Sequence, residues 1–160
     1  MKQVNQIMQM QEYRECYDAI WQLEMERPYC KHDMGHFLDV ARIACIMKEE
    51  RGLSIPREAI YMVGILHDIG RHLQYREGIP HEIASAKIAR NLLETIAYDP
   101  SSTEEIVKAI ESHRNKMVAN TNTFAGIIYD ADKASRACYD CKVQDKCNWS
   151  HEKKNLEIKY

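Results

Sequence analysis

The sequence of 160 residues is 45% hydrophobic and 29% charged, with a formal net charge of −2. This length suits one compact domain, and the composition excludes a disordered chain. The slightly acidic balance gives no general attraction to nucleic acid, so any affinity for phosphate must be local.

The spacing of apolar residues predicts helices along nearly the whole chain, because these residues recur at three- and four-residue steps. The apolar stripes and expected helices are, in chain order, Tyr13–Ile20, Phe37–Met47, Ala59–Leu66, Ile83–Ile96, a helix from Ser102 to about Ser112, and one over about 123–136. The boundary signals are Pro28, Arg51-Gly52, Ser54-Ile-Pro56, Pro80, Asp99-Pro100 and the capping sequence Ser102-Thr-Glu-Glu105. No alternating strand pattern, internal repeat or linker is present. We therefore expect an all-α, compact single-domain bundle of about six to seven helices.

Within this bundle we expect two regions. Residues 1–136 should form the main helical domain, including an N-terminal helix, and residues 137–160 a cysteine-containing C-terminal extension packed on the same domain. No apolar stretch approaches the roughly 20 residues that span a bilayer, and the start Met1-Lys-Gln-Val-Asn-Gln lacks a signal-peptide core. We expect a cytoplasmic protein.

The run Gly64-Ile-Leu-His-Asp-Ile-Gly-Arg71 places an imidazole and a carboxylate, His67 and Asp68, at the end of an apolar helix. Burial of hydrocarbon alone would not produce this pair, and it is typical of half a metal site. Gly70 should let the helix finish directly after the pair.

Further candidate ligands stand near the ends of other expected helices. His36 begins the second helix, His81 begins the fourth, His113 follows the fifth and Asp132 lies in the sixth. Imidazole and carboxylate ligands suit zinc, iron, manganese or cobalt, and ligand type does not choose among these metals.

In the order His36, His67-Asp68, Asp132, the sequence resembles the HD-domain metal-dependent phosphohydrolases over roughly residues 30 to 136. Gly70 and the run Ala131-Asp-Lys133 belong to the same pattern, which favours Asp132 over Asp130 as the final ligand. The resemblance implies hydrolysis of a phosphoester or phosphoanhydride bond by a metal-activated water.

In the binuclear branch of that family, the aspartate of the doublet bridges two ions. The resemblance implies one ion at His36, His67 and Asp132, a second at His81 and His113, and Asp68 between them. Two such ions can clamp a phosphoryl group and activate water, and Asp68 would also orient or deprotonate that water.

Arg71 stands where family members often carry a lysine, and its planar guanidinium suits phosphate oxygens. We expect it to take part in catalysis and phosphate binding, with a surface arginine at a helix end as the alternative. Lys133 and Arg136 are further phosphate-binding candidates. His32, His72 and His151 receive no role, and Asp33 and Asp39 are interpreted as ordinary exposed carboxylates.

The motif order is closest to that of the bacterial symmetrical dinucleoside-tetraphosphate hydrolases. Glu82 and Arg114 stand where that branch commonly has Gly and Thr. The expected partner is a small phosphorylated molecule of the nucleotide type, such as a dinucleoside polyphosphate. Alternatives are a mononuclear nucleotide monophosphatase and a catalytically silent metal-containing binding or regulatory module. Neither a membrane nor a nucleic acid is expected as a partner, and a homo-oligomer stays open.

Six cysteines in a chain without a secretory signal indicate reduced thiols or metal ligands before disulfides. Cys138, Cys141 and Cys147 have the spacing of a soft-metal loop, but a closed zinc site needs a fourth ligand. The candidates for that ligand are His151, Cys16, Cys30 and Cys45. The alternatives are three reduced thiols partly buried beside Trp149, and an iron–sulfur cluster.

Overall fold

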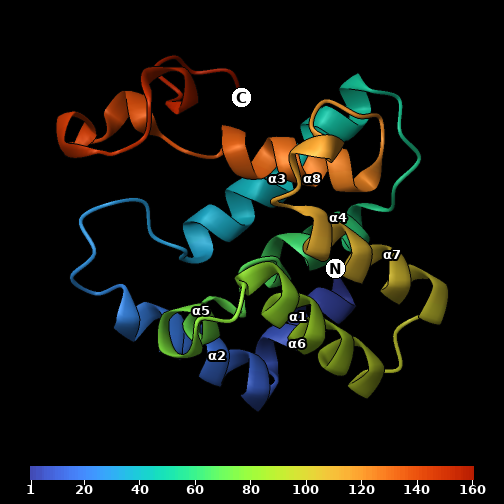
Figure 1. Ribbon diagram of the computed structural model, residues 1–160. Coiled ribbons are helices and arrows are strands. Elements are labelled where there is room, and N and C mark those ends of the chain that lie inside the picture. The colour runs from blue at the N-terminus through green and yellow to red at the C-terminus, as the bar shows by residue number, and fades with distance from the viewer.

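The computed structural model describes residues 1–160 and contains helices and turns without any strand (Figure 1). The α-helices are α1 (Lys2–Gln9), α2 (Gln11–Leu23), α3 (Met34–Glu50), α4 (Arg57–Leu66), α5 (Arg71–Glu77), α6 (His81–Thr95), α7 (Pro100–Ser112) and α8 (Phe124–Ala134). A short 3-10 turn, η1 (Lys116–Val118), lies between α7 and α8, and three more follow α8 as η2 (Cys138–Asp140), η3 (Gln144–Lys146) and η4 (His151–Lys153). The expected all-α fold is confirmed.

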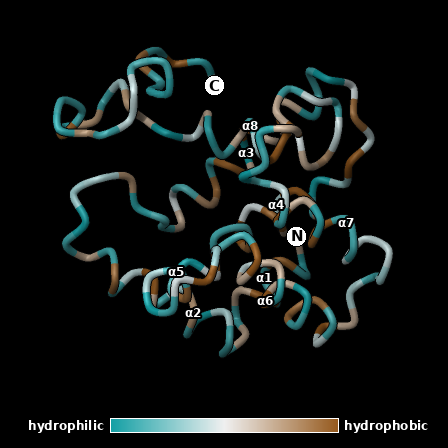
Figure 2. Tube along the Cα trace, in the orientation of Figure 1, coloured by the Kyte–Doolittle hydropathy of each residue, from teal (hydrophilic) through white to brown (hydrophobic).

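Helix α4 lies at the centre of the bundle and packs against α1, α3, α6, α7 and α8. Its residues from Ala59 to Leu66 are buried except Tyr61, as expected for a helix that is apolar nearly all round. Figure 2 shows hydrophobic segments gathered around this helix. Because α4 is surrounded, its C-terminal end delivers the doublet His67-Asp68 into the interior.

Two short helices were not anticipated. The N-terminal stretch is split at Met10, which has an extended backbone and separates α1 from α2. Arg71 begins α5, which ends at Gly78 with a left-handed φ of 73°.

The expected start of the fifth helix was wrong. Helix α7 begins at Pro100, and the Asp99 side chain accepts a hydrogen bond from the Ser102 backbone N–H, so Asp99 is the N-cap in place of Ser102. A proline at the first helical position, preceded by an aspartate cap, explains why the helix starts earlier.

Gly70 is needed for a different reason from the one expected. Its φ is −86°, so no left-handed helix ending is present. A Cβ at this position would lie 2.4 Å from the Ser85 backbone N and 2.7 Å from the Ala84 backbone C. The turn after α4 therefore packs directly on the backbone of α6, and the Gly70 N–H donates to the Ser85 hydroxyl at 2.9 Å.

The chain beyond α8 is built differently from the bundle. It consists of the turns η2, η3 and η4 and lies along one side of the molecule, red in Figure 1. Figure 2 shows that this segment is largely hydrophilic. No helix in the molecule combines the length and apolar character required to cross a membrane.

Candidate metal centre

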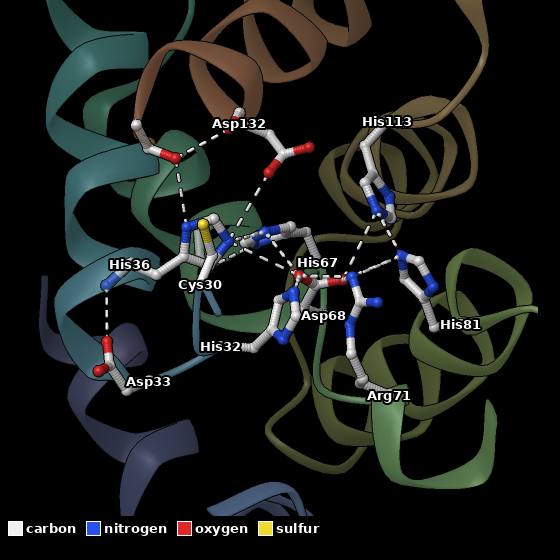
Figure 3. Close-up of polar contacts among 12 residues, drawn as sticks. Cys30, His32, Asp33, His36, His67, Asp68, Arg71, His81, His113 and Asp132 are labelled. Atoms are coloured by element: carbon white, nitrogen blue, oxygen red, sulfur yellow. Dashed lines mark hydrogen bonds and ion pairs between the residues drawn. The ribbon is translucent and has the colours of Figure 1, made fainter. Parts of the chain in front are cut away.

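Two helices approach each other closely where the first ligands lie. A Cβ on Gly64 of α4 would lie 2.8 Å from the Ala41 Cβ and 2.9 Å from the Phe37 carbonyl oxygen of α3. This contact brings His67, after the end of α4, beside His36 in the first turn of α3 (Figure 3). The Asp33 side chain caps α3 by accepting from the His36 N–H at 3.0 Å, so Asp33 is a structural cap and not an ordinary exposed carboxylate.

The predicted ligands form two adjoining sets of side chains. The first donor group consists of His36, His67 and Asp132, and the second donor group consists of Asp68, His81 and His113; within each group the donor atoms lie within 4.8 Å of one another. Asp130 is outside both groups, because it pairs with Arg51 at 2.6 Å. All six residues predicted as ligands are thus brought together from α3, α4, α6, α7 and α8 or the turns at their ends.

All four histidines are held with Nε2 facing the centre. The Nδ1–H of His67 donates to the Gly64 carbonyl at 2.9 Å and that of His113 to the Ile110 carbonyl at 2.6 Å. His81 Nδ1 lies 2.5 Å from the Gln74 Oε1. The Ser135 hydroxyl donates to the Asp132 carbonyl and accepts from His36 Nδ1 at 3.2 Å, so the Nδ1 atom of each of the four histidines has a partner. Such partners fix the tautomer and leave each Nε2 with a free lone pair.

These lone pairs face each other in two pairs. His36 Nε2 lies 3.2 Å from His67 Nε2, and His81 Nε2 lies 3.1 Å from His113 Nε2. Two acceptors at this distance repel unless a proton lies between them or a metal ion lies beside them both. Two nitrogens each about 2.1 Å from one ion stand roughly 3.0–3.4 Å apart, so the donor sets fit a divalent transition metal.

Asp68 connects the two donor groups through its separate oxygens. Oδ2 faces the first group, at 3.6 Å from His36 Nε2 and 3.5 Å from His67 Nε2. Oδ1 faces the second group, at 3.0 Å from His81 Nε2 and 3.7 Å from His113 Nε2. One carboxylate is therefore placed to serve both groups.

The lowered pKa values of His67, Asp68 and Asp132 suit metal ligands. Burial lowers the pKa of His67 to about 3, which keeps the ring neutral at neutral pH. Burial opposes ionisation of Asp68, but the positive charge of Arg71 and the surrounding imidazoles outweigh it and hold the pKa well below the usual range. For Asp132, burial is likewise outweighed, chiefly by Lys133, and the pKa is lowered.

Arg71 lies inside the centre and is not a surface arginine. Its Nη2 donates to Asp68 Oδ1 at 3.0 Å and Oδ2 at 3.2 Å, and it also lies 3.2 Å from His81 Nε2. Its Nε is buried without a hydrogen-bond partner. A donor left unused at the edge of a cavity can serve a ligand.

A cavity of about 500 Å³ opens in front of both donor groups, within the size range of small-molecule sites. Its wall carries an excess of cations, namely Arg27, Lys31, Arg71, Arg114, Lys133, Arg136 and Lys154. Only Asp39 and Asp132 supply carboxylates to the same wall. The net acidic chain therefore has a local positive cavity next to the metal centre.

The remaining predicted phosphate ligands differ in their surroundings. Lys133 pairs with Asp132 and lies over the Tyr129 ring at 4.9 Å. Arg136 stacks on Trp149 at 4.3 Å and donates to the Lys153 carbonyl at 3.1 Å, so it is engaged with the C-terminal segment. Both line the cavity.

His32 was not expected to have a role, yet its Nε2 lies 3.7 Å from Asp68 Oδ2 (Figure 3). Glu24 holds this ring, accepting from the His32 backbone N–H at 2.7 Å and lying 2.5 Å from His32 Nδ1. Burial raises the pKa of Glu24, but its hydrogen bonds with His32 and Tyr75 outweigh this effect and lower it to about 2. The signal in the sequence was a second His-Asp pair, His32-Asp33, just before the expected second helix.

The cysteines divide into two sets. Cys138, Cys141 and Cys147 line the cavity together with Cys30, from the loop between α2 and α3. Cys16 and Cys45 pack against the hydrophobic core, and His151 does not line the cavity.

Gly70→Ala should destabilise the fold by about 1–3 kcal/mol, because the new Cβ meets backbone atoms that cannot rotate away. It should also lower metal binding, since the displaced turn separates Asp68 from His81. Gly52→Ala is the control, because its Cβ would meet nothing within 4 Å and only its φ of 62° is strained. Thermal unfolding and metal analysis of both variants check this prediction; full metal content in Gly70→Ala would contradict it.

Comparison with known proteins gives a consistent family. The family model for the HD domain matches residues 34–137. A protein of Clostridium beijerinckii described as uncharacterized is 47% identical over 137 residues, covering 86% of this chain and 85% of the relative.

More distant relatives are longer proteins. Ribonuclease Y of Salinispora arenicola is 31% identical over 107 residues, covering 67% of this chain but 16% of the relative. Ribonuclease Y of Lawsonia intracellularis is 29% identical over 116 residues, with 72% and 20% covered. The chain thus spans a fifth or less of these two ribonucleases.

A solved structure supports the fold. The crystal structure of a predicted HD superfamily hydrolase from an uncultured Thermotogales bacterium superposes with a TM-score of 0.66. The two chains are 23% identical, with 93% of this chain and 82% of the other covered.

Proposed function

Because the chain belongs to the HD-domain family, whose model matches residues 34–137, we propose that it is a metal-dependent phosphohydrolase acting on a nucleotide-type substrate. The observation that carries this proposal is the pair of donor groups joined by Asp68 at the floor of a cationic cavity.

The donor groups support a binuclear centre. His36, His67 and Asp132 would hold one ion, His81 and His113 the other, and Asp68 would bridge them. When bound, such ions act as Lewis acids and generate a strong nucleophile from water at neutral pH. Asp68 would in addition orient the attacking water, because its carboxylate lies between the two groups.

The cavity supports a substrate with several phosphates. Arg71 donates to Asp68 at the centre of the donor groups, and its planar guanidinium suits phosphate oxygens. Arg114 lies at the cavity wall, paired with Glu82 at 3.3 Å. Seven cationic side chains exceed what one phosphate needs, which favours a polyphosphate such as a dinucleoside polyphosphate.

Glu82 and Arg114 distinguish this chain from the dinucleoside-tetraphosphate hydrolase branch of the family. These residues follow His81 and His113, at the positions where the dinucleoside-tetraphosphate hydrolases commonly have Gly and Thr. Their side chains form an ion pair, which links the start of α6 after His81 to the chain after His113. The ribonuclease Y relatives make an RNA phosphodiester the competing substrate.

Substrate competition tests this proposal. Diadenosine tetraphosphate, a nucleoside monophosphate and a short RNA are compared in the presence of Mn²⁺, and we expect the highest kcat/KM for the tetraphosphate. Arg71→Ala should lower that value by about 10- to 150-fold, because one charge-assisted hydrogen bond contributes about 1.5–3 kcal/mol. Arg76→Ala, on the same helix but exposed and outside the cavity, is the control. A higher kcat/KM for the RNA than for the tetraphosphate would contradict the proposed nucleotide-type substrate and assign an RNA phosphodiester in its place.

A further inference from the structure

The C-terminal segment lacks the usual source of stability. No residue after Ala131 is buried, and the turns η2, η3 and η4 contain no buried side chain. A segment that buries no apolar side chain needs another constraint to offset its loss of conformational entropy.

The contacts that hold this segment are polar and partly exposed. The Asn155 side-chain amide donates to the carbonyls of Lys133 and Arg136 at 2.8 and 3.0 Å. The Tyr29 hydroxyl donates to the Lys146 carbonyl at 3.3 Å. Contacts of this kind each contribute little. We therefore expect a stronger link between the C-terminal segment and the helical bundle.

Four thiols line the same cavity, Cys138, Cys141 and Cys147 from this segment and Cys30 from the bundle. The turn η2 begins at Cys138 and ends before Cys141, whose N–H donates to the Cys138 carbonyl at 3.3 Å. The turn η3 ends before Cys147. Cys30 comes from the loop between α2 and α3, and Figure 3 draws its sulfur on the side of the centre where His36 lies. None of the four is in a disulfide.

The thiols also influence one another and have cationic neighbours. Burial raises the pKa of Cys30, and the negative charges of the Cys138 and Cys141 thiolates raise it further. Arg136 acts in the opposite direction on Cys30. Mutual repulsion among thiolates is relieved when a metal binds them.

The four sulfurs are not gathered tightly enough to surround a single metal ion. Only the two donor groups of His and Asp bring three donor atoms within 4.8 Å of one another, so no three of the sulfurs are that close. Four sulfurs around one zinc stand ~3.8 Å apart, because each Zn–S bond is about 2.3 Å. Cysteines around a cubane iron–sulfur cluster stand roughly 6 Å apart, since iron and sulfide ions fill the space between them.

We propose that Cys30, Cys138, Cys141 and Cys147 are the four ligands of an iron–sulfur cluster, which fastens the C-terminal segment to the bundle. The cluster would form one wall of the cavity in front of the His and Asp centre. Cys30 supplies the fourth ligand that the C-terminal spacing lacks. This site is independent of the proposed hydrolysis.

The test is the full chain expressed with iron and purified without oxygen. We expect visible absorption near 400 nm, with acid-labile sulfide that the His and Asp centre cannot supply. Cys30→Ser and Cys141→Ser should each lose the sulfide and the absorption, while the metal at His36, His67 and Asp132 is retained, which shows that the bundle is folded. Cys45→Ser, outside the cavity, should match the wild type.

Two outcomes would overturn the cluster. One is wild-type protein that lacks labile sulfide and visible absorption and has four freely titratable thiols at these positions. The other is one zinc ion per chain that is lost in Cys30→Ser and Cys141→Ser, which would assign the four thiolates to a structural zinc site.

Discussion

Asp68→Asn is expected to abolish phosphohydrolase activity, with a loss of about 10³-fold or more. The substitution keeps the shape of the side chain but removes the carboxylate whose Oδ1 and Oδ2 face the second and first donor groups. Loss of a ligand shared by two ions removes several kcal/mol of transition-state stabilisation, and each 1.36 kcal/mol is tenfold in rate. Steady-state hydrolysis and metal content of the same preparation measure the effect.

Asp18→Asn makes the same chemical change at an exposed position on α2 and serves as the control. Far-UV circular dichroism should show that both variants keep the helical fold. If Asp68→Asn turned over substrate at a rate near that of the wild type, the role assigned to this carboxylate would be wrong.

The second large effect concerns the number of ions. His81→Ala and His113→Ala should each lower the bound metal from two ions per chain toward one, because each removes a ligand of the second donor group only. His36→Ala should instead deplete the first group. Hydrolysis should fall in all three variants, and elemental analysis after removal of loose metal gives the stoichiometry.

His151→Ala is the matched control, since His151 is exposed and lies outside the cavity. Unchanged metal content in both His81→Ala and His113→Ala would contradict a binuclear centre. The mononuclear nucleotide monophosphatase would then be the better account.

The sequence predicted best those features that depend on one helix alone, namely the positions of helices and of the candidate ligands along them. Apolar periodicity located α2, α3, α4 and α6. The candidate ligands stand at helix ends or within one late helix, so their approximate positions followed from local signals. The boundaries were less well predicted, because Pro100 and Asp99 compete with Ser102 for the start of α7.

Features that depend on contacts between distant segments could not be predicted. The Glu24 and His32 pair exists because the end of α2 lies beside the entry to α3. Gly70 was singled out, but the backbone of α6 that requires it lies in another element. Cys30 was one of four candidate partners for the C-terminal cysteines, and only the fold brings it, and neither Cys16 nor Cys45, to the cavity.

The central claim is that the two donor groups hold metal ions that support hydrolysis, and chelation with reconstitution tests it most directly. Release of p-nitrophenol from bis-p-nitrophenyl phosphate is followed in metal-replete protein, in chelated protein, and after return of Mn²⁺ or Fe²⁺. We predict turnover that is lost on chelation and restored as two ions per chain are bound again. Protein that binds two ions per chain but shows no turnover with any of these metals would contradict the account and leave a metal-containing binding module.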